Sequence, residues 1–258
     1  MKQKGEKALQ GVTERGIYMY NILICDDEAD IRSAIRIYLE ADGHTVFEAE
    51  NGRQMLEIVR KEEIHLLLMD IMMPVMDGIR ALALLREFSN IPVILLTAKT
   101  QDSDKILGLN AGADDYITKP FNPVEVTARV KSQLRRYMRL GGSSAQSAPE
   151  AVLCNGGIEL DVKSKTVIVD GEPISLTPTE FLLLKFFMEN QEQVFSPKEI
   201  YRRVWNDDPL GAENTVTVHI RHLREKIEIN PASPDYLKVV WGHGYKMESK
   251  PAPRGEKQ

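Results

Sequence analysis

The sequence predicts an open α/β sheet in the first half of the chain and a smaller α+β unit in the second half. Apolar runs of strand length recur through the first half, and each is followed by polar or charged residues. The second half has another pattern, in which short strand-like runs precede two helix-start signals, a long amphipathic stretch and a glycine-containing hairpin. The length of 258 residues fits two domains of ordinary size.

Four of these runs bring their last residues to one edge of the predicted sheet. Asp26 and Asp27 follow the first run, and Asp70 follows the second. Thr97 ends the third run and Lys119 the fourth. Chemistry in such a sheet collects outside the carboxyl ends of the parallel strands. Three neighbouring carboxylates repel one another unless a divalent cation lies among them, so we expect a Mg²⁺ site at which an aspartate can attack phosphorus.

Four blocks in the first half resemble a response-regulator receiver domain. They are 25–28 (CDDE), 69–78 (MDIMMPVMDG), 96–98 (LTA) and 112–121 (GADDYITKPF), in the expected order. The resemblance implies a flavodoxin-like, doubly wound (βα)5 fold. It also implies a role for each matching residue: Asp70 as phosphoacceptor, Mg²⁺ held by Asp26, Asp27, Asp70 and the backbone carbonyl of Met72, Thr97 and Lys119 on the phosphoryl group, and Tyr116 as the switch aromatic.

The second half contains three predicted helices framed by strands. Strand-like runs at 157–161 and 166–169 lead to a turn at Asp170-Gly171. Thr177 and Ser196 each precede a proline and stand three residues before a glutamate, which indicates two helix starts. The third helix, 213–229, has a buried stripe at intervals of four, three and four, and its opposite face is of the kind usually solvated. The stretch 236–247 follows as a hairpin, so the layout is that of a winged helix.

This half resembles the effector domain of the OmpR/PhoB family at 176–181, 215–227 and 240–245. The resemblance implies that the third helix enters the DNA major groove and that the wing approaches the minor groove. The wing is similar to that of the VanR-like branch of Gram-positive bacteria. Trp241 in this wing either contacts DNA or packs against its own domain. The implied DNA contacts are Asn214, Thr217, Val218, His219, Arg221, His222, Arg224 and Trp241.

Composition alone does not predict DNA binding, because residues 152–258 hold 14 basic against 16 acidic side chains. Phosphate contacts must therefore come from local placement of Lys and Arg, and a monomer with few of them should bind weakly. We expect a dimer on repeated half-sites for this reason. The family pairs its receivers through the fourth helix, the fifth strand and the fifth helix, and the charged residues at such positions here are Lys105, Asp115, Glu125, Arg129 and Arg136.

The domain organisation expected from composition has five parts. Residues 1–18 read as a disordered extension, 19–140 as the receiver, 141–151 as a flexible Gly/Ser-rich linker, 152–249 as the DNA-binding domain and 250–258 as a disordered tail. No run approaches the roughly 18 apolar residues of a membrane span, and no secretory signal is evident. We expect a cytoplasmic protein without membrane contact.

Two functions follow from these patterns. The first is a two-component response regulator that takes phosphate from a sensor histidine kinase on Asp70, dimerises, binds promoter DNA and acts on RNA polymerase. The alternative is a metal-dependent phosphatase that forms an aspartyl-phosphate on Asp70. That alternative predicts an acid two residues beyond the nucleophile, where this chain has Met72. The position favours a regulator over an enzyme.

Overall fold

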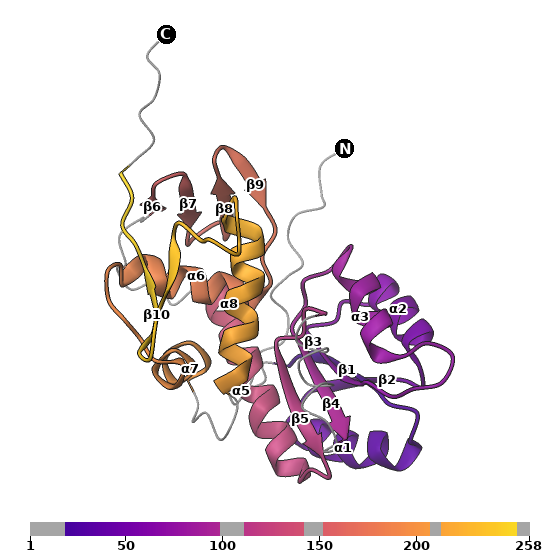
Figure 1. Ribbon diagram of the computed structural model, residues 1–258. Coiled ribbons are helices and arrows are strands. Elements are labelled where there is room, and N and C mark those ends of the chain that lie inside the picture. The colour runs from indigo at the N-terminus through magenta and orange to yellow at the C-terminus, as the bar shows by residue number, and fades with distance from the viewer. Residues whose placement is uncertain (1–18, 99–110, 142–151, 207–212, 252–258) are drawn as a thin grey trace, which may run out of the picture.

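The N-terminal domain is built on a parallel sheet. The computed structural model describes residues 19–98, 111–141, 152–206 and 213–251 (Figure 1). Within these residues the N-terminal sheet has the order β2-β1-β3-β4-β5. Its elements are β1 (Asn21–Cys25), α1 (Ala29–Ala41), β2 (Thr45–Ala49), α2 (Gly52–Lys61), β3 (Leu66–Asp70), α3 (Gly78–Arg86), β4 (Val93–Ala98), β5 (Asp115–Lys119) and α5 (Pro123–Gly141).

Helices cover both faces of this sheet. Ile22 and Ile24 point to the face where α1 and α5 pack, whereas Leu23 and Cys25 point to the face covered by α2 and α3. The alternation follows from the two-residue period of a strand. β2 lies on one side of β1, and β3, β4 and β5 follow one another on its other side. The strand order therefore reverses at β1. In open α/β sheets, ligands bind outside the carboxyl ends of the strands at such a reversal, which here lies between β1 and β3.

The C-terminal domain combines an antiparallel sheet, three helices and a hairpin. The sheet has the order β6-β7-β8-β9, and β10 pairs with β11. One apolar core, with Phe187 and Trp205 among its largest members, joins the helices to both sheets. The elements are β6 (Val152–Asn155), β7 (Ile158–Asp161), β8 (Thr166–Val169), β9 (Glu172–Ile174), α6 (Pro178–Glu189), α7 (Pro197–Trp205), α8 (Glu213–Ile227), β10 (Leu237–Val240) and β11 (Gly244–Met247).

Local sequence signals explain most of these elements. Thr177 and Ser196 each accept a hydrogen bond from the backbone N–H three residues on, and Glu180 and Glu199 bond back, so both capping boxes are confirmed. The turn between β8 and β9 has Asp170 and Gly171 at positive φ, as a tight hairpin turn requires. β6 was not predicted, and it pairs with β7 at the edge of the sheet.

The hairpin β10–β11 is fixed to the end of α8. The buried carboxylate of Glu228 accepts hydrogen bonds from the backbone N–H groups of Asp235, Tyr236 and Leu237 at 2.6 to 3.1 Å. A charged acceptor for three N–H groups is a strong anchor. These bonds attach the start of the wing to the end of α8.

The two domains are in contact. Val218 of α8 belongs to the same buried apolar cluster as Leu95 and Ala113 of the N-terminal domain. Figure 1 shows α8 on the side of the C-terminal domain that faces the N-terminal sheet. The predicted extension 1–18 lies outside the described residues, as do 142–151 of the predicted linker 141–151 and 252–258 of the predicted tail 250–258. Gly141 is the last residue of α5, and the Lys250 N–H donates to Asn155 Oδ1 at 2.7 Å. Among the described helices, none is long and apolar enough to cross a membrane.

Candidate functional site

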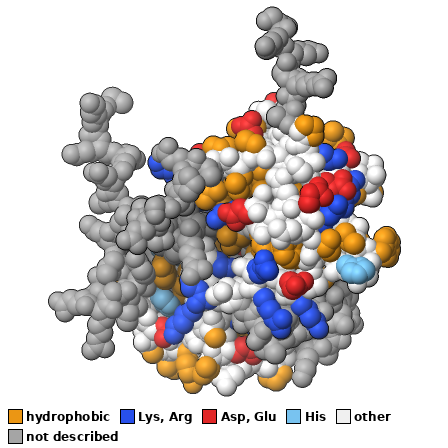
Figure 2. Space-filling view, turned by 90° about the vertical axis from the view of Figure 1, so that its left-hand side faces the viewer, with side chains coloured by type: hydrophobic (Ala, Val, Ile, Leu, Met, Phe, Trp, Pro, Cys, Tyr) orange, Lys and Arg blue, Asp and Glu red, His pale blue; other side chains and the backbone are white. Residues whose placement is uncertain are grey.

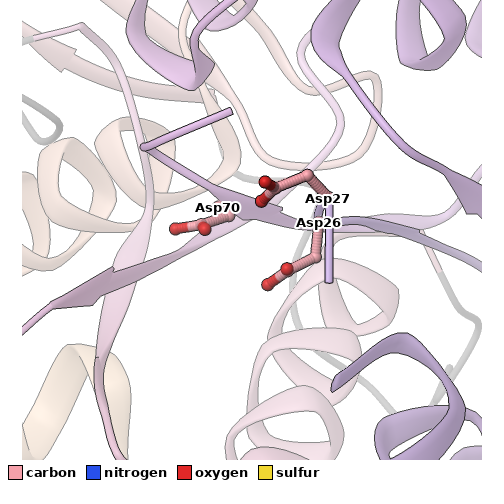
Figure 3. Close-up of side chains that lie close together, drawn as sticks. All are labelled: Asp26, Asp27 and Asp70. Carbon is pink, nitrogen blue, oxygen red and sulfur yellow. The ribbon is translucent and has the colours of Figure 1, made fainter. Parts of the chain in front are cut away.

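The three predicted carboxylates lie together at the carboxyl ends of β1 and β3. One oxygen from each of Asp26, Asp27 and Asp70 lies within 4.8 Å of the others. Figure 3 shows the three side chains directed toward the same space. Asp26 and Asp70 are buried, whereas Asp27 is exposed. These hard oxygen donors, gathered at one point with an open side, fit Mg²⁺, which binds one or two carboxylates and keeps waters.

Lys119 at the end of β5 joins this cluster. Its Nζ donates to Asp26 Oδ2 at 2.8 Å and to Asp70 Oδ2 at 2.9 Å, and lies 3.7 Å from Glu28 Oε1. Burial works to lower the pKa of Lys119, but the hydrogen bonds to the two aspartates outweigh it and raise that pKa. The ammonium is therefore held charged between two carboxylates, at the place predicted for it.

The Asp70 carboxylate is oriented by both of its oxygens. Oδ1 accepts a hydrogen bond from the backbone N–H of Ile71 at 2.7 Å, while Oδ2 faces Lys119. Burial raises the pKa of Asp70, Lys119 opposes the rise, and Asp26 adds to it. Burial and like charge thus make the bare carboxylate less stable than in water. A cation at the cluster relieves both effects.

The remaining predicted receiver residues lie on β4, on β5 and in the loop after β3. Thr97 is buried at the end of β4, and its hydroxyl donates to the Ala98 carbonyl at 3.2 Å. Tyr116 is half-buried and packs against the apolar cluster under α2 and α3. Met72 is 71% exposed, so its side chain is not part of the apolar core.

Only part of the predicted DNA-contacting set is exposed. Thr217 is exposed on α8, and Arg221 is exposed with Nε 3.0 Å from Glu225 Oε1. Arg224 is half-buried and donates to the Leu237 carbonyl from Nε and Nη2. The side chain of Asn214 lies outside the described part. Figure 2 shows Lys and Arg side chains gathered on one part of the face turned toward the viewer, which agrees with local placement of positive charge.

Trp241 lies on the wing with 90% of its surface exposed. The alternative in which its indole packs against its own domain is therefore wrong in this structure. Gly242 at φ +75° and Gly244 at φ +137° make the bend beside it. A side chain at Gly244 would collide with the Phe195 carbonyl. Phe195 forms a β-bridge with Tyr245 of β11, and this bridge attaches the wing to the residues just before α7.

Three predicted DNA contacts on α8 are covered by the N-terminal domain. Val218, His219 and His222 are each less than one-tenth exposed. His219 Nε2 lies 3.3 Å from the Asp114 carbonyl, and its ring is tilted against Trp205 at 5.4 Å between centroids. Part of this face of α8 is therefore closed, although Arg221 and Glu225 on it are exposed, because a helical wheel does not record a second domain.

Burial lowers the pKa of His219 to about 4, although the nearby Glu180 works in the opposite direction. Its Nδ1 has no hydrogen-bond partner among the described residues. Burial also lowers the pKa of His222, again against Glu180. Both imidazoles are neutral at ordinary pH in this arrangement.

The predicted dimer residues are engaged within the chain. Arg129 Nη1 lies 3.3 Å from Asp115 Oδ2, and its Nε lies 3.4 Å from Glu125 Oε1. Arg136 Nη1 donates to the carbonyl of Trp205 at 3.0 Å. Lys105 lies outside the described residues. Arg129 and Arg136 thus contact Tyr201 and Trp205 of α7 in the C-terminal domain.

Sequence reasoning missed the residues that join the domains. Thr179 Oγ1 donates to Asp114 Oδ1 at 2.8 Å, and Ser132 Oγ donates to the Trp205 carbonyl at 3.3 Å. Asn90 Nδ2 donates to Ser175 Oγ at 2.7 Å. Each of these side chains is ordinary in its own local sequence. Asp114 was the single sequence signal of an interdomain contact. It is an acidic residue in the 112–121 block for which the acidic cluster gives no role.

Comparison with family models assigns both halves of the chain. Residues 22–131 match the response regulator receiver domain, and residues 171–247 match the transcriptional regulatory protein, C terminal. The two models cover the acidic cluster and α8 with its wing, respectively.

Two curated relatives match this chain over nearly their whole length. The chain is 42% identical over 228 residues to regulatory protein VanR of Enterococcus faecium, covering 88% of this chain and 98% of VanR. It is 38% identical over 228 residues to transcriptional regulatory protein ResD of Bacillus subtilis, covering 88% and 95%. Structures of two RitR mutants match with a TM-score of 0.70 each, at 22% and 24% identity, covering 89% of this chain and 99% of theirs.

Proposed function

This chain belongs to the OmpR/PhoB-type two-component response regulators, and from this premise we propose that Asp70 takes a phosphoryl group from a sensor histidine kinase and so controls binding to promoter DNA. The observation that carries the proposal is the pair of hydrogen bonds from Lys119 to Asp26 and Asp70. They set a fixed positive charge beside the carboxylate that would receive the phosphoryl group.

The transfer is a nucleophilic substitution at phosphorus. An oxygen of Asp70 attacks the phosphorus of the phosphorylated kinase, the bond from phosphorus to the imidazole breaks, and the imidazole leaves. Mg²⁺, held by Asp26, Asp27, Asp70 and the backbone carbonyl of Met72, would neutralise charge on the phosphoryl oxygens when bound. Lys119 would supply a second positive charge beside the group, since its Nζ already donates to Asp70 Oδ2.

The phosphoryl group would then reach β4 and β5 through two residues. Lys119 stays beside the new negative charge and draws the end of β5 toward it. Thr97 exchanges its hydrogen bond with the Ala98 carbonyl for one with a phosphoryl oxygen. Tyr116 on β5 is half-buried next to these changes and is placed to repack with them.

The output of the domain would be DNA binding by a dimer. α8 would enter the major groove with the exposed Thr217 and Arg221, and the exposed Trp241 would reach the backbone or minor groove beside it. Pairing of two receivers would place two such domains on repeated half-sites and bring RNA polymerase to the promoter. We place this activity in the cytoplasm, with 19–140 and 152–249 as the two domains and 141–151 as their linker.

Replacement of Asp70 by Asn tests the proposal. Asp70→Asn keeps the side-chain volume but removes the nucleophile, so acetyl phosphate with Mg²⁺ should add a phosphoryl group to the wild type and none to the variant. Asp30→Asn is the matched control, because Asp30 is exposed on α1 and carries the same charge. The measurement is intact mass followed by peptide mapping.

Two results would contradict the proposal. One is an adduct mapped to another residue in the wild type. The other is sustained turnover of an external phosphomonoester, which would favour the phosphatase alternative, for which the comparisons give no support.

A further inference from the structure

We propose that Arg32 is a positioning residue for the acidic cluster of Asp26, Asp27 and Asp70. Its guanidinium holds the backbone of Asp26 and Asp27, so that their carboxylates stay directed toward the space that they share with Asp70 (Figure 3). This role rests on the proposed function, because it concerns the same Mg²⁺ site. A guanidinium offers donors and no acceptor, so Arg32 acts on the site without being a ligand.

Arg32 contacts two successive carbonyl groups of the turn after β1. Its Nη1 donates to the carbonyl of Asp26 at 2.6 Å and to that of Asp27 at 3.2 Å. Arg32 lies near the start of α1, where its own backbone N–H donates to the Glu28 carbonyl at 3.2 Å. Hydrogen bonds from a charged donor are stronger than those from a neutral one. The guanidinium therefore fixes the orientation of both peptide groups, and with it the direction of the side chains beside them.

The two aspartates differ in what else holds them. The Asp26 N–H donates to the Ala49 carbonyl at 3.1 Å, and Asp26 Oδ1 accepts from the Glu28 N–H at 2.9 Å. Asp27 is exposed, and within the described part of the chain its one hydrogen bond is the one from Arg32 to its carbonyl. Loss of Arg32 should therefore release Asp27 more than Asp26.

Two glutamates balance the charge of Arg32. Its Nε donates to Glu48 Oε2 at 3.2 Å and its Nη2 to Glu50 Oε1 at 3.3 Å. Glu48 belongs to β2, and Glu50 follows that strand directly. Arg32 is only 7% exposed, and a buried charge is costly unless it is paired. The two carboxylates also lessen the repulsion that the guanidinium would exert on a cation at the acidic cluster.

The charge of Arg32 and its hydrogen bonds act on a bound cation in opposite directions. The positive charge disfavours a divalent cation at the cluster, whereas the hydrogen bonds favour one by keeping its ligands in place. Removal of Arg32 should therefore strengthen cation binding if the charge dominates, and weaken it if the positioning dominates. Partners that orient metal ligands typically contribute about 10- to 100-fold to affinity, so we expect the positioning to dominate.

Arg32→Met tests this expectation, because it removes the charge and all donors of the side chain and keeps an unbranched apolar stem. The probe is Mn²⁺, which takes the same oxygen ligands as Mg²⁺. Electron paramagnetic resonance of the free ion measures its binding without any phosphoryl transfer. We expect Arg32→Met to bind Mn²⁺ about 10-fold more weakly than the wild type.

Arg36→Met is the matched control. Arg36 also lies on α1 and donates to Glu48 Oε1 at 2.8 Å, but among the described contacts it reaches no atom of Asp26 or Asp27. Its replacement takes the same charge from the same helix. The Arg36 side chain is 43% exposed and therefore screened by salt, so we expect Mn²⁺ affinity to change by less than about 2-fold.

Arg32→Lys separates geometry from charge. An ammonium keeps the positive charge but lacks the planar fork, so it cannot bond the two carbonyls and Glu48 together. We expect Mn²⁺ binding to weaken in this variant as well, by less than in Arg32→Met. The melting temperature of each variant without Mn²⁺ shows whether the chain is folded under the conditions of the binding measurement.

The outcomes separate this inference from the proposed function. Unchanged or tighter Mn²⁺ binding in Arg32→Met would overturn the inference, and if that variant does not fold, wild-type affinity in Arg32→Lys would overturn it equally. An equal loss in Arg36→Met would also overturn it, because a general effect on α1 would then explain both variants. A chain in which only the Arg32 variants lose Mn²⁺ affinity, but whose wild type takes no phosphate on Asp70, would instead contradict the proposed function.

Discussion

Closure of the two domains should weaken as the pH falls, because His219 is buried neutral at their interface. Its pKa is lowered from 6.5 to about 4 by burial. In an open chain the ring returns toward 6.5 and binds a proton below that pH. The closed state keeps its full stability above pH 6.5 and loses it progressively as the pH falls from 6.5 toward 4.

The size of the effect follows from these two values. At about pH 5.5 an imidazole with a pKa of 6.5 is roughly 90% protonated, whereas one with a pKa near 4 is almost entirely neutral. Closure should therefore be about 10-fold weaker than at about pH 7.5, which corresponds to about 1.4 kcal/mol. This is an upper value, since Trp205 of its own domain contributes part of the burial.

Other charged groups near His219 are paired and should not dominate this change. Asp114 is held by Arg86, Asp115 by Arg129, and Glu180 by Lys226 at 2.6 Å. The pKa of His222 is also lowered, so it adds to the effect in the same direction. Arg136 reaches His219 only across Trp205. The groups that act on the ring are thus Glu180, His222, the backbone carbonyl of Asp114, and Asp115.

In a Ser132→Cys chain whose exposed Cys154 is replaced by Ser, the labelling rate of the new thiol measures the opening of the two domains. The labelling rate also depends on the ionisation of the thiol itself. The same measurement in a chain that also carries His219→Gln corrects for that ionisation. The labelling rate of the chain with His219, divided by that of the chain with His219→Gln, should rise about 10-fold as the pH falls from about 7.5 to about 5.5. His243→Gln on the exposed wing is the control and should leave the ratio with wild type flat. A constant ratio for His219→Gln across this range would refute the reasoning.

The remaining predictions concern the phosphoryl site and the DNA surface. Lys119→Ala should still accept phosphate but should shift less toward dimer on size exclusion, because the ammonium that joins Asp70 to β5 is gone; an undiminished shift would contradict this. Trp241→Ala should weaken DNA binding while leaving the melting temperature and the salt dependence nearly unchanged, since the indole is exposed and uncharged; a large fall in melting temperature would count against a DNA contact. Arg221→Ala should reduce the slope of log affinity against log salt by about 0.9 if the guanidinium meets a phosphate, or should cost about 1–3 kcal/mol at one base position if it reads a base edge, and an unaltered slope and specificity would exclude both.

Local sequence determined the elements and the cluster of Asp26, Asp27, Asp70 and Lys119. Asp26 directly follows β1, and Asp70 and Lys119 end β3 and β5, so the parallel sheet brings all three to one edge whatever the conformation of the loops. Thr177 with Glu180 fixed the start of α6 in the same way, because a capping box involves only neighbours in the chain. Signals of this kind involve residues that are close together in the chain, so they can be recognised in a single sequence.

Only the tertiary structure decided which side chains are free to act. Val218, His219 and His222 were predicted on an open face of α8, and they are buried because a second domain packs there. Trp241 had two possible places until the wing was seen to hold it away from its own domain. Contacts such as Thr179 with Asp114 join residues 65 positions apart, and the energy of such a contact depends on geometry that no local period encodes.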